Sequence, residues 1–341
     1  MKNFKCYITG EELTKANSRD EHIIQSSLGG KLKSPRLITS DLNDHFGKTI
    51  DKALAESIPL GPILGIKTDR GGKSDLGGSS DSGHNYSLLF GKQEAIRKPH
   101  RPEDFVDENG TPWKIQHGSK EFIEQLYKQK RAEYSDLSDE EFSKKCKIVP
   151  NKEELLEFYP RESFHPISGL DQCRAVAKIA ANYYVFKRYN PTYLSQIVPF
   201  IELGITPLSR RVRNETMISN YYDIRLENLG VKSDEISHVI YLEGNPYEGL
   251  LFSYIELYNT YCMMILLNDR YTGKKFTDYY KQNLITNKET STPPDLDIDY
   301  LEIRRLYFDK SEEVFQGFKN RAERTLGVKG IQLVTKQKEP T

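Results

Sequence analysis

The segment from residue 21 to residue 51 constrains the fold more than any other part of this 341-residue chain. It opens with a carboxylate and a histidine, followed by the apolar pair Ile23-Ile24, and such a short run predicts a β-strand. The adjacent pair Gly29-Gly30 predicts a loop, because glycine accepts positive φ angles at little cost. The chain is therefore expected to turn back shortly after this strand.

The rest of the segment predicts a return strand and a helix. Residues 36–39 are expected to form the second short strand, and Ser40 is a suitable N-cap for the helix that follows. Apolar residues then recur at spacings of three and four, which predicts one buried helix face: Leu42, Phe46, Ile50, Ala53 and Leu54. The expected local order is strand, loop, strand, helix.

This order, with these residues, resembles the HNH endonucleases, also called His-Me finger or ββα-metal nucleases. The residues that match are Glu21-His22-Ile23-Ile24, Leu28-Gly29-Gly30, Asn43, Phe46-Gly47 and Ile50-Asp51. The resemblance covers roughly the first 57 residues. It implies a general-base histidine at His22, a metal-binding carboxylate at Glu21 and a metal-binding amide at Asn43.

The same residue types suit the hydrolysis of a phosphodiester bond. A histidine can activate water near neutral pH, and a hard cation can stabilise charge on the attacked phosphate. Oxygen ligands from Glu21 and Asn43 favour Mg²⁺ over zinc, with Mn²⁺ as a substitute. Three cationic residues near the predicted turn, Lys31, Lys33 and Arg36, are candidates to contact the backbone phosphate.

Helix geometry ranks two further candidates, His45 and Asp51. At about 100° per residue, His45 projects about 160° away from Asn43, so the two are not expected to share one ion. Asp51 lies about 80° round and two turns further on, which suits a supporting or capping contact behind the metal ligands. For His22, Glu21 and Asn43 the alternative is structural: a solvent-facing histidine, a surface carboxylate and an amide bonded to the helix backbone.

Relatives in such a group often carry two CxxC pairs that form a structural zinc site. Here the two positions read Cys6-Tyr7-Ile8-Thr9 and Thr39-Ser40-Asp41-Leu42, so one cysteine of the four remains. We therefore expect no structural zinc, and expect packing to take over its role. The candidates for that packing are Tyr7, Ile8, Leu42 and Phe46.

Charge and hydropathy exclude some classes of protein. Lys and Arg together number 49, as do Asp and Glu, so the chain lacks the global basic charge that marks many nucleic-acid binders. Any contact with DNA must then come from a local basic patch. The N-terminus lacks an apolar signal core, and the most apolar later run, 261–267, is too short to span a bilayer. We expect a cytoplasmic protein that makes no membrane contact.

The predicted fold class is α+β, divided into four segments. A nuclease module occupies residues 1–60, a Gly/Ser-rich linker or mobile loop 61–83, a larger mixed α+β domain 84–330, and a polar tail 331–341. In the larger domain, helices are expected at 119–134, 137–142, 152–158, 168–189, 277–283, 300–308 and 311–326. Strands are expected at 85–90, 238–242 and within 250–267, with a hairpin at 105–116.

The helix expected at 168–189 carries Arg174, Lys178, Lys187 and Arg188. Two interpretations of these cations stay open: a phosphate-binding surface, or a solvated helix face. Its apolar residues are small, which suits close packing at the centre of the larger domain.

Two functions from different classes follow. The first is a Mg²⁺-dependent endonuclease that acts on DNA in preference to RNA and leaves a 5′-phosphate, with the larger domain providing substrate binding, oligomerisation or sensing. By analogy, a nuclease with a sensing domain suits bacterial restriction or antiphage defence. A symmetric homodimer would place its two sites on opposite strands of a DNA duplex. The second is a non-catalytic module that binds nucleic acid or another ligand on a degenerate HNH fold.

Overall fold

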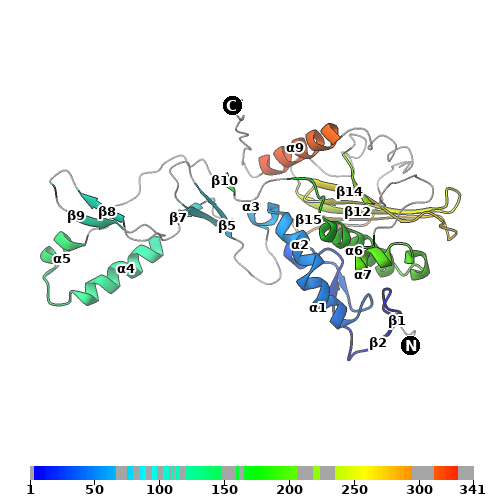
Figure 1. Cartoon of the computed structure of the whole chain (residues 1–341), viewed down its shortest axis with the longest axis horizontal. Coiled ribbons are helices and arrows are strands. Elements are labelled where there is room, and N and C mark those ends of the chain that lie inside the picture. The colour runs from blue at the N-terminus through cyan, green and yellow to red at the C-terminus, as the bar shows by residue number, and fades with distance from the viewer. Residues whose placement is uncertain are drawn as a thin grey trace. The chain divides into compact units, whose positions relative to one another are not determined.

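The computed structural model describes residues 4–66, 75–79, 85–89, 94–97, 103–106, 110, 112–115, 120–146, 159–160, 165–205, 218–222, 235–293 and 311–328. These residues form a mixture of helices and antiparallel strands, which confirms the predicted α+β class (Figure 1). The chain divides into two compact units: Met1–Gly72 together with Phe164–Thr341, and Lys73–Ser163.

This division differs from the predicted one, in which a module at 1–60 preceded a separate domain at 84–330. The N-terminal segment instead shares one unit with the C-terminal half of the chain. The physical reason is that buried hydrogen bonds join them, such as the one at 2.8 Å between His238 Nε2 and the carbonyl oxygen of Leu28. The predicted linker at 61–83 also contains a strand, β5 (Asp75–Ser79).

The first unit begins with short elements in the predicted order. A hairpin of β1 (Phe4–Lys5) and β2 (Glu12–Leu13) precedes the antiparallel pair β3 (Glu21–His22) and β4 (Lys33–Ser34). The 3₁₀ helix η1 (Ser26–Leu28) lies in the loop of that pair, and α1 (Ser40–Lys48), α2 (Ile50–Ser57) and α3 (Leu60–Ile63) follow. The second strand was predicted at 36–39, but the chain turns back earlier, after Gly29, whose φ is +91°.

Two details of the following helix differ from the prediction. Its N-cap is Thr39 and not Ser40, because the Thr39 hydroxyl accepts a hydrogen bond from the Leu42 amide at 3.4 Å. The helix is also interrupted at Thr49, whose hydroxyl donates to the His45 carbonyl at 2.8 Å, so that α1 and α2 are separate. The predicted apolar stripe survives this break, and its buried members are Phe46, Ile50 and Leu54.

A six-stranded antiparallel sheet forms the core of the first unit, in the order β11-β14-β13-β12-β15-β16. Its strands are β11 (Ile218–Asn220), β12 (Ser237–Asn245), β13 (Leu250–Leu257), β14 (Tyr261–Asn268), β15 (Phe276–Asn283) and β16 (Glu289–Thr290). The strands predicted within 238–267 are confirmed. The helix predicted at 277–283 is wrong, because this segment pairs with β12 along its whole length and becomes β15.

Both faces of this sheet are covered, and every residue of β13 and β14 is buried. The helix α6 (Leu170–Phe186), predicted at 168–189, packs on one face, where Tyr183 contacts Tyr280. The helix α9 (Ser311–Gly327) lies on the opposite face, where Arg321 contacts Glu256 (Figure 1). Between them in sequence lie the short helices η2 (Pro191–Leu194) and α7 (Val198–Leu203).

The second unit contains a four-stranded sheet, a hairpin and two helices. The sheet order is β10-β5-β6-β7, with β6 (Asn85–Leu89), β7 (Glu94–Arg97) and β10 (Tyr159–Pro160). The predicted hairpin is confirmed as β8 (Glu103–Val106) and β9 (Pro112–Ile115), and the predicted helices as α4 (Lys120–Glu133) and α5 (Asp139–Lys145). Helices predicted at 152–158 and 300–308, and the tail at 331–341, lie outside the described residues.

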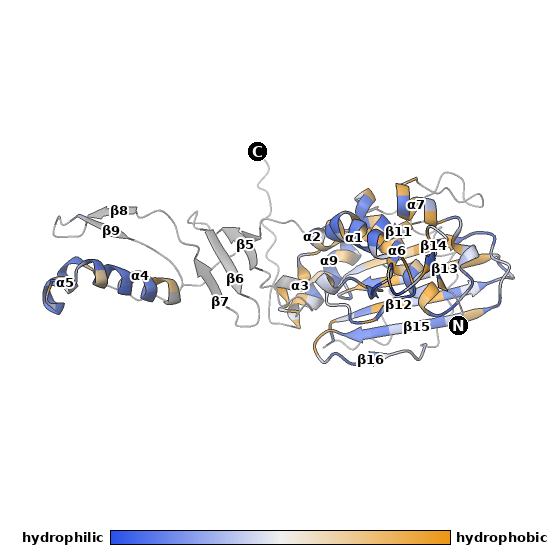
Figure 2. Ribbon diagram, turned by 90° about the horizontal axis from the view of Figure 1, so that it is seen from below, coloured by the Kyte–Doolittle hydropathy of each residue, from blue (hydrophilic) through white to orange (hydrophobic). Residues whose placement is uncertain are grey.

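Hydropathy differs between the central strands of the large sheet and the helices α4 and α5. Figure 2 shows hydrophobic residues along the central strands of the large sheet, whereas α4 and α5 are mainly hydrophilic. Among the helices that the structure describes, none is long and apolar enough to cross a membrane.

Candidate active site

Strand β3 carries two of the predicted site residues, Glu21 and His22. Successive side chains of a strand point to opposite faces, so the two lie in different surroundings. Glu21 is 4% exposed and faces α6, whereas His22 is half-buried. The Glu21 carboxylate, expected to be a metal ligand, lies inside the protein.

The third predicted residue, Asn43, lies on α1 beside the start of β3. Its side-chain nitrogen Nδ2 donates to the carbonyl oxygen of Asp20 at 3.4 Å, directly before Glu21. This contact uses the nitrogen of the amide, which leaves the oxygen Oδ1 as the atom able to bind a cation. The fold thus brings Asn43 to the strand that carries Glu21 and His22.

Glu21 has a buried partner that the sequence did not indicate. The Lys178 ammonium of α6 lies 2.6 Å from Glu21 Oε1 and 2.6 Å from Asp51 Oδ2, and Lys178 is 1% exposed. Both interpretations of Lys178 given above, a phosphate-binding surface and a solvated face, are therefore wrong for this residue. Asp51, expected to support the site from behind, is the second carboxylate of the same group.

Burial and charge act in opposite directions on these groups. Burial alone would lower the pKa of Lys178, but the carboxylates of Asp51 and Glu21 outweigh it, and the pKa stands above its ordinary value. Burial raises the pKa of Glu21, Lys178 opposes this rise, and the Asp51 carboxylate adds to it. Burial is the largest of these effects, so Glu21 keeps a raised pKa even though it is paired with a lysine.

Two amides and a tyrosine complete what we call the α6 cluster: Tyr7, Glu21, Gln25, Asp51, Lys178 and Asn182. Asn182 Nδ2 donates to Glu21 Oε1 at 3.2 Å and to the carbonyl oxygen of His22 at 3.3 Å. The Tyr7 hydroxyl donates to Asn182 Oδ1 at 2.9 Å, so Tyr7 has a polar role besides the packing predicted for it. Gln25 Nε2 donates to Asp51 Oδ1 at 2.8 Å. The cluster therefore fixes the backbone of β3 as well as the Glu21 side chain.

The loop between β3 and β4 is held by the large sheet. The Leu28 carbonyl accepts from His238 Nε2 at 2.8 Å and from the Tyr258 hydroxyl at 2.7 Å, and the Gly29 carbonyl accepts from Gln282 Nε2 at 2.9 Å. Gly30 has no room for a side chain, because a Cβ atom there would lie 2.0 Å from the Ile24 carbonyl oxygen.

His238 is the most buried histidine of this region and has a structural role. Its Nδ1 accepts from the Tyr258 amide at 3.2 Å, so the ring hydrogen is on Nε2, which donates to Leu28. Burial lowers the pKa of His238 to about 4. The ring is therefore neutral at physiological pH.

The remaining predicted residues lie around β3 and β4. Lys33 Nζ is 3.1 Å from Asp20 Oδ2, and the Arg36 guanidinium lies over the Phe4 ring at 4.5 Å from its centre. The backbone amide of Lys31 donates to the Gln282 side chain at 3.2 Å. His45 is exposed and contacts the Phe46 ring, with no link to Asn43 in the described contacts.

The donor atoms at β3 suit a hard cation. Both contacts of Glu21 with α6 use Oε1, so Oε2 is the oxygen that can serve as a ligand, together with Asn43 Oδ1. No group of three or more His, Cys, Asp or Glu side chains able to hold a metal gathers within the described part of the chain. An ion at β3 would be held by two protein oxygens, with water and phosphate as its other ligands.

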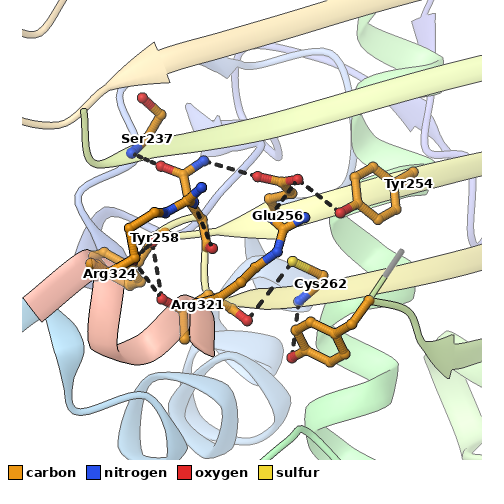
Figure 3. A network of polar contacts seen from close by, with 11 residues as sticks. Ser237, Tyr254, Glu256, Tyr258, Cys262, Arg321 and Arg324 are labelled. Atoms are coloured by element: carbon orange, nitrogen blue, oxygen red, sulfur yellow. Dashed lines mark hydrogen bonds and ion pairs between the residues drawn. The ribbon is translucent and has the colours of Figure 1, made fainter. Parts of the chain in front are cut away.

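A second buried polar network, drawn in Figure 3, joins α9 to the sheet. Arg321 Nη1 donates to Glu256 Oε1 at 3.0 Å, and the Tyr254 hydroxyl donates to the same carboxylate at 2.8 Å. Burial raises the pKa of the nearby Cys262 thiol to about 12, which excludes it as a nucleophile near neutral pH. We assign a structural role to this network.

Comparison with known proteins gives no relationship from which a function could be transferred. No protein-family model, no curated protein and no solved structure matches the chain. The interpretation of the site therefore depends on its residues and their geometry.

Proposed function

We propose that this protein is a metal-dependent endonuclease that hydrolyses phosphodiester bonds, with DNA as the favoured substrate. The observation that supports this most is the contact between Asn43 and the Asp20 carbonyl, which brings an amide of α1 to the strand that carries Glu21 and His22. The strand pair and the helix that follows it also have the order expected from the resemblance to HNH endonucleases.

In this proposal each residue at β3 has one role. His22 accepts a proton from the attacking water. Glu21 Oε2 and Asn43 Oδ1 would hold Mg²⁺, or Mn²⁺ in its place, and the ion would supply stabilisation of charge on the phosphate. Oxygen-only protein ligands favour these hard cations over zinc.

Two exposed cations next to the strand pair are suited to contact a phosphate. Lys33 lies on β4 opposite His22, and Arg36 follows two residues after that strand. The ion pair between Lys33 and Asp20 is about half exposed, and such surface pairs contribute little stability. Lys33 can therefore exchange Asp20 for a phosphate at low cost.

One observation favours the second candidate, a non-catalytic binding module. The Glu21 carboxylate is already paired with Lys178, and a metal ion bound to Glu21 would lie near that ammonium. Repulsion between the two cations would weaken metal binding. If this repulsion prevents the ion from binding, the strand pair and the helix keep their shape but hydrolyse nothing.

The test is cleavage of supercoiled and linear DNA, with RNA in parallel, in Mg²⁺, Mn²⁺ or EDTA. We expect the wild type to cut DNA in either metal, and His22→Ala to lose at least about 100-fold in rate, as removal of a general base costs. His165→Ala, which removes an exposed histidine remote in sequence from β3, is the control and should cut as the wild type does. An equally active His22→Ala refutes the assignment, and absence of hydrolysis in all conditions favours the binding module.

A further inference from the structure

We infer that Lys178 and Asn182, both on α6, are positioning residues for the site on β3. The site would then be completed by a helix that follows it by more than 150 residues in the chain. This inference rests on the proposed function, because it names the residues that hold His22 and Glu21 in place for that reaction.

The two residues act from one face of α6. They are four positions apart, about one helical turn, so their side chains project side by side. Lys178 is 1% exposed and Asn182 is fully buried. Their side chains make ion pairs and hydrogen bonds of 2.6 to 3.3 Å with β3, with α2 and with Tyr7. This face of α6 is therefore dedicated to the N-terminal segment.

Each positioning residue controls a different part of β3. Asn182 donates to the carbonyl oxygen of His22 at 3.3 Å, which restricts rotation of the peptide that follows the His22 Cα atom. Lys178 pairs with Oε1 of Glu21 at 2.6 Å, which restricts the orientation of that carboxylate. One residue thus orients the proposed base, and the other orients the proposed ligand.

Packing alone does not account for a lysine and an asparagine at these places. Aliphatic and aromatic residues, among them Ala175, Ile179 and Tyr183, fill the rest of this buried stretch of α6. Burying a charge and an amide costs solvation free energy, and apolar residues of similar volume are often as stabilising or more so. A fully connected polar network does impose one arrangement on its members, and that property suits a catalytic strand.

The test compares Asn182→Ala with a matched control, Asn268→Ala. Asn268 is also buried and also donates from Nδ2 to a backbone carbonyl, that of Tyr193 at 2.7 Å, but it lies at the end of β14. The direct readout is the ring resonance of His22 by NMR in histidine-labelled, metal-free protein, assigned among the seven histidines with His22→Ala. We expect Asn182→Ala to shift this resonance and Asn268→Ala to leave it in place.

The kinetic readout is DNA cleavage by the same proteins in Mg²⁺. We expect kcat to fall about 10- to 100-fold in Asn182→Ala, with KM within about 3-fold of the wild type, because the change affects orientation and not binding. The melting temperatures of the variants show whether a fall in kcat comes from lower stability alone. If Asn182→Ala does not fold, Tyr7→Phe removes only the hydroxyl that orients the Asn182 amide and should cause a smaller change of the same kind.

The outcomes separate the inference from the proposed function. A shifted His22 resonance with a reduced kcat supports both. A shifted resonance in a wild type that cleaves nothing supports the positioning role and refutes the nuclease. An unshifted resonance in Asn182→Ala, and in Tyr7→Phe where that variant is needed, overturns the inference whatever the activity.

Discussion

At the scale of single residues, the β3 site depends on buried polar side chains whose partners come from distant parts of the chain. Glu21 has Lys178 and Asn182, and the loop after β3 has His238 and Gln282. Such partners stabilise the fold only in the protonation state that makes the hydrogen bond or ion pair, since an unpaired buried polar group costs about 1–3 kcal/mol. The residues around the site are therefore expected to respond to pH.

His238 makes the fold sensitive to mild acid. Folding lowers its pKa from 6.5 to about 4, so the native state favours the neutral ring. The stabilisation is complete above pH 6.5 and is lost as pH falls towards 4, because the unfolded chain binds a proton that the native state does not. From this shift we expect His238 to account for a loss of about 3 kcal/mol over that range.

The measurement is urea unfolding at several pH values for the wild type and His238→Gln. Glutamine can still donate to the Leu28 carbonyl but does not titrate. The free energy of unfolding of the variant should therefore fall less than that of the wild type between pH 6.5 and 4. Carboxylates titrate equally in both proteins, and the difference between the two curves isolates the histidine. Parallel curves would show that His238 does not carry this dependence.

The positions of candidate site residues could be predicted from the sequence where they follow a local pattern, and not where they depend on tertiary partners. The resemblance to HNH endonucleases singled out Glu21, His22 and Asn43, which lie on or beside β3. Lys178 was placed on a solvated or phosphate-binding face because it was considered with its charged neighbours. Residues 175–184 are buried all round, and Lys178 is their only charged residue; this isolation was the available signal.

At the scale of elements, the loop between β3 and β4 depends on close backbone packing at Gly30. The glycine pair was predicted to form a turn, and Gly29 does adopt a positive φ. The close approach of Gly30 to the Ile24 carbonyl could not be predicted, because it depends on how η1 folds within the loop. The same limit explains β15, whose residues were interpreted as helical until their pairing with β12 was known.

Gly30→Ala is expected to destabilise the protein by at least about 2 kcal/mol, because its Cβ would lie 2.0 Å from a backbone oxygen that cannot move freely. Gly47→Ala on α1 is the control, since a Cβ there meets nothing within 4 Å. That control should gain about 0.5–1 kcal/mol from the better helix propensity of alanine. Chemical unfolding of both variants tests this, and equal stability would contradict the tight packing at Gly30.

At the scale of the whole molecule, the N-terminal segment and the C-terminal half form one unit. The α6 cluster joins them at β3. Hydrogen bonds from Tyr258 and Gln282 to the carbonyl oxygens of Leu28 and Gly29 join them at the loop after β3. The sequence led to a boundary near residue 60 because the resemblance ends there. Helix α2 packs against α6, and buried polar groups such as Lys178 and His238 add contacts between the segment and the later chain. No periodic pattern in the sequence predicts which residues make these contacts.

Residues 1–66 alone are therefore expected not to fold. The fragment would leave Glu21 without its ammonium partner, and the carbonyl oxygens of Leu28 and Gly29 without their donors. Far-UV circular dichroism and NMR dispersion of the purified fragment, with the full chain as control, measure this. A fragment that melts cooperatively and shows dispersed resonances would contradict the single-unit description.

The most direct measurement of the central claim is the rate of DNA cleavage in Mg²⁺ by the wild type and by His22→Ala at equal folded concentration. The proposed site predicts a wild-type rate that EDTA abolishes, and a rate at least about 100-fold lower in the variant. Equal rates in the two proteins would contradict the assignment of His22 as the base on β3.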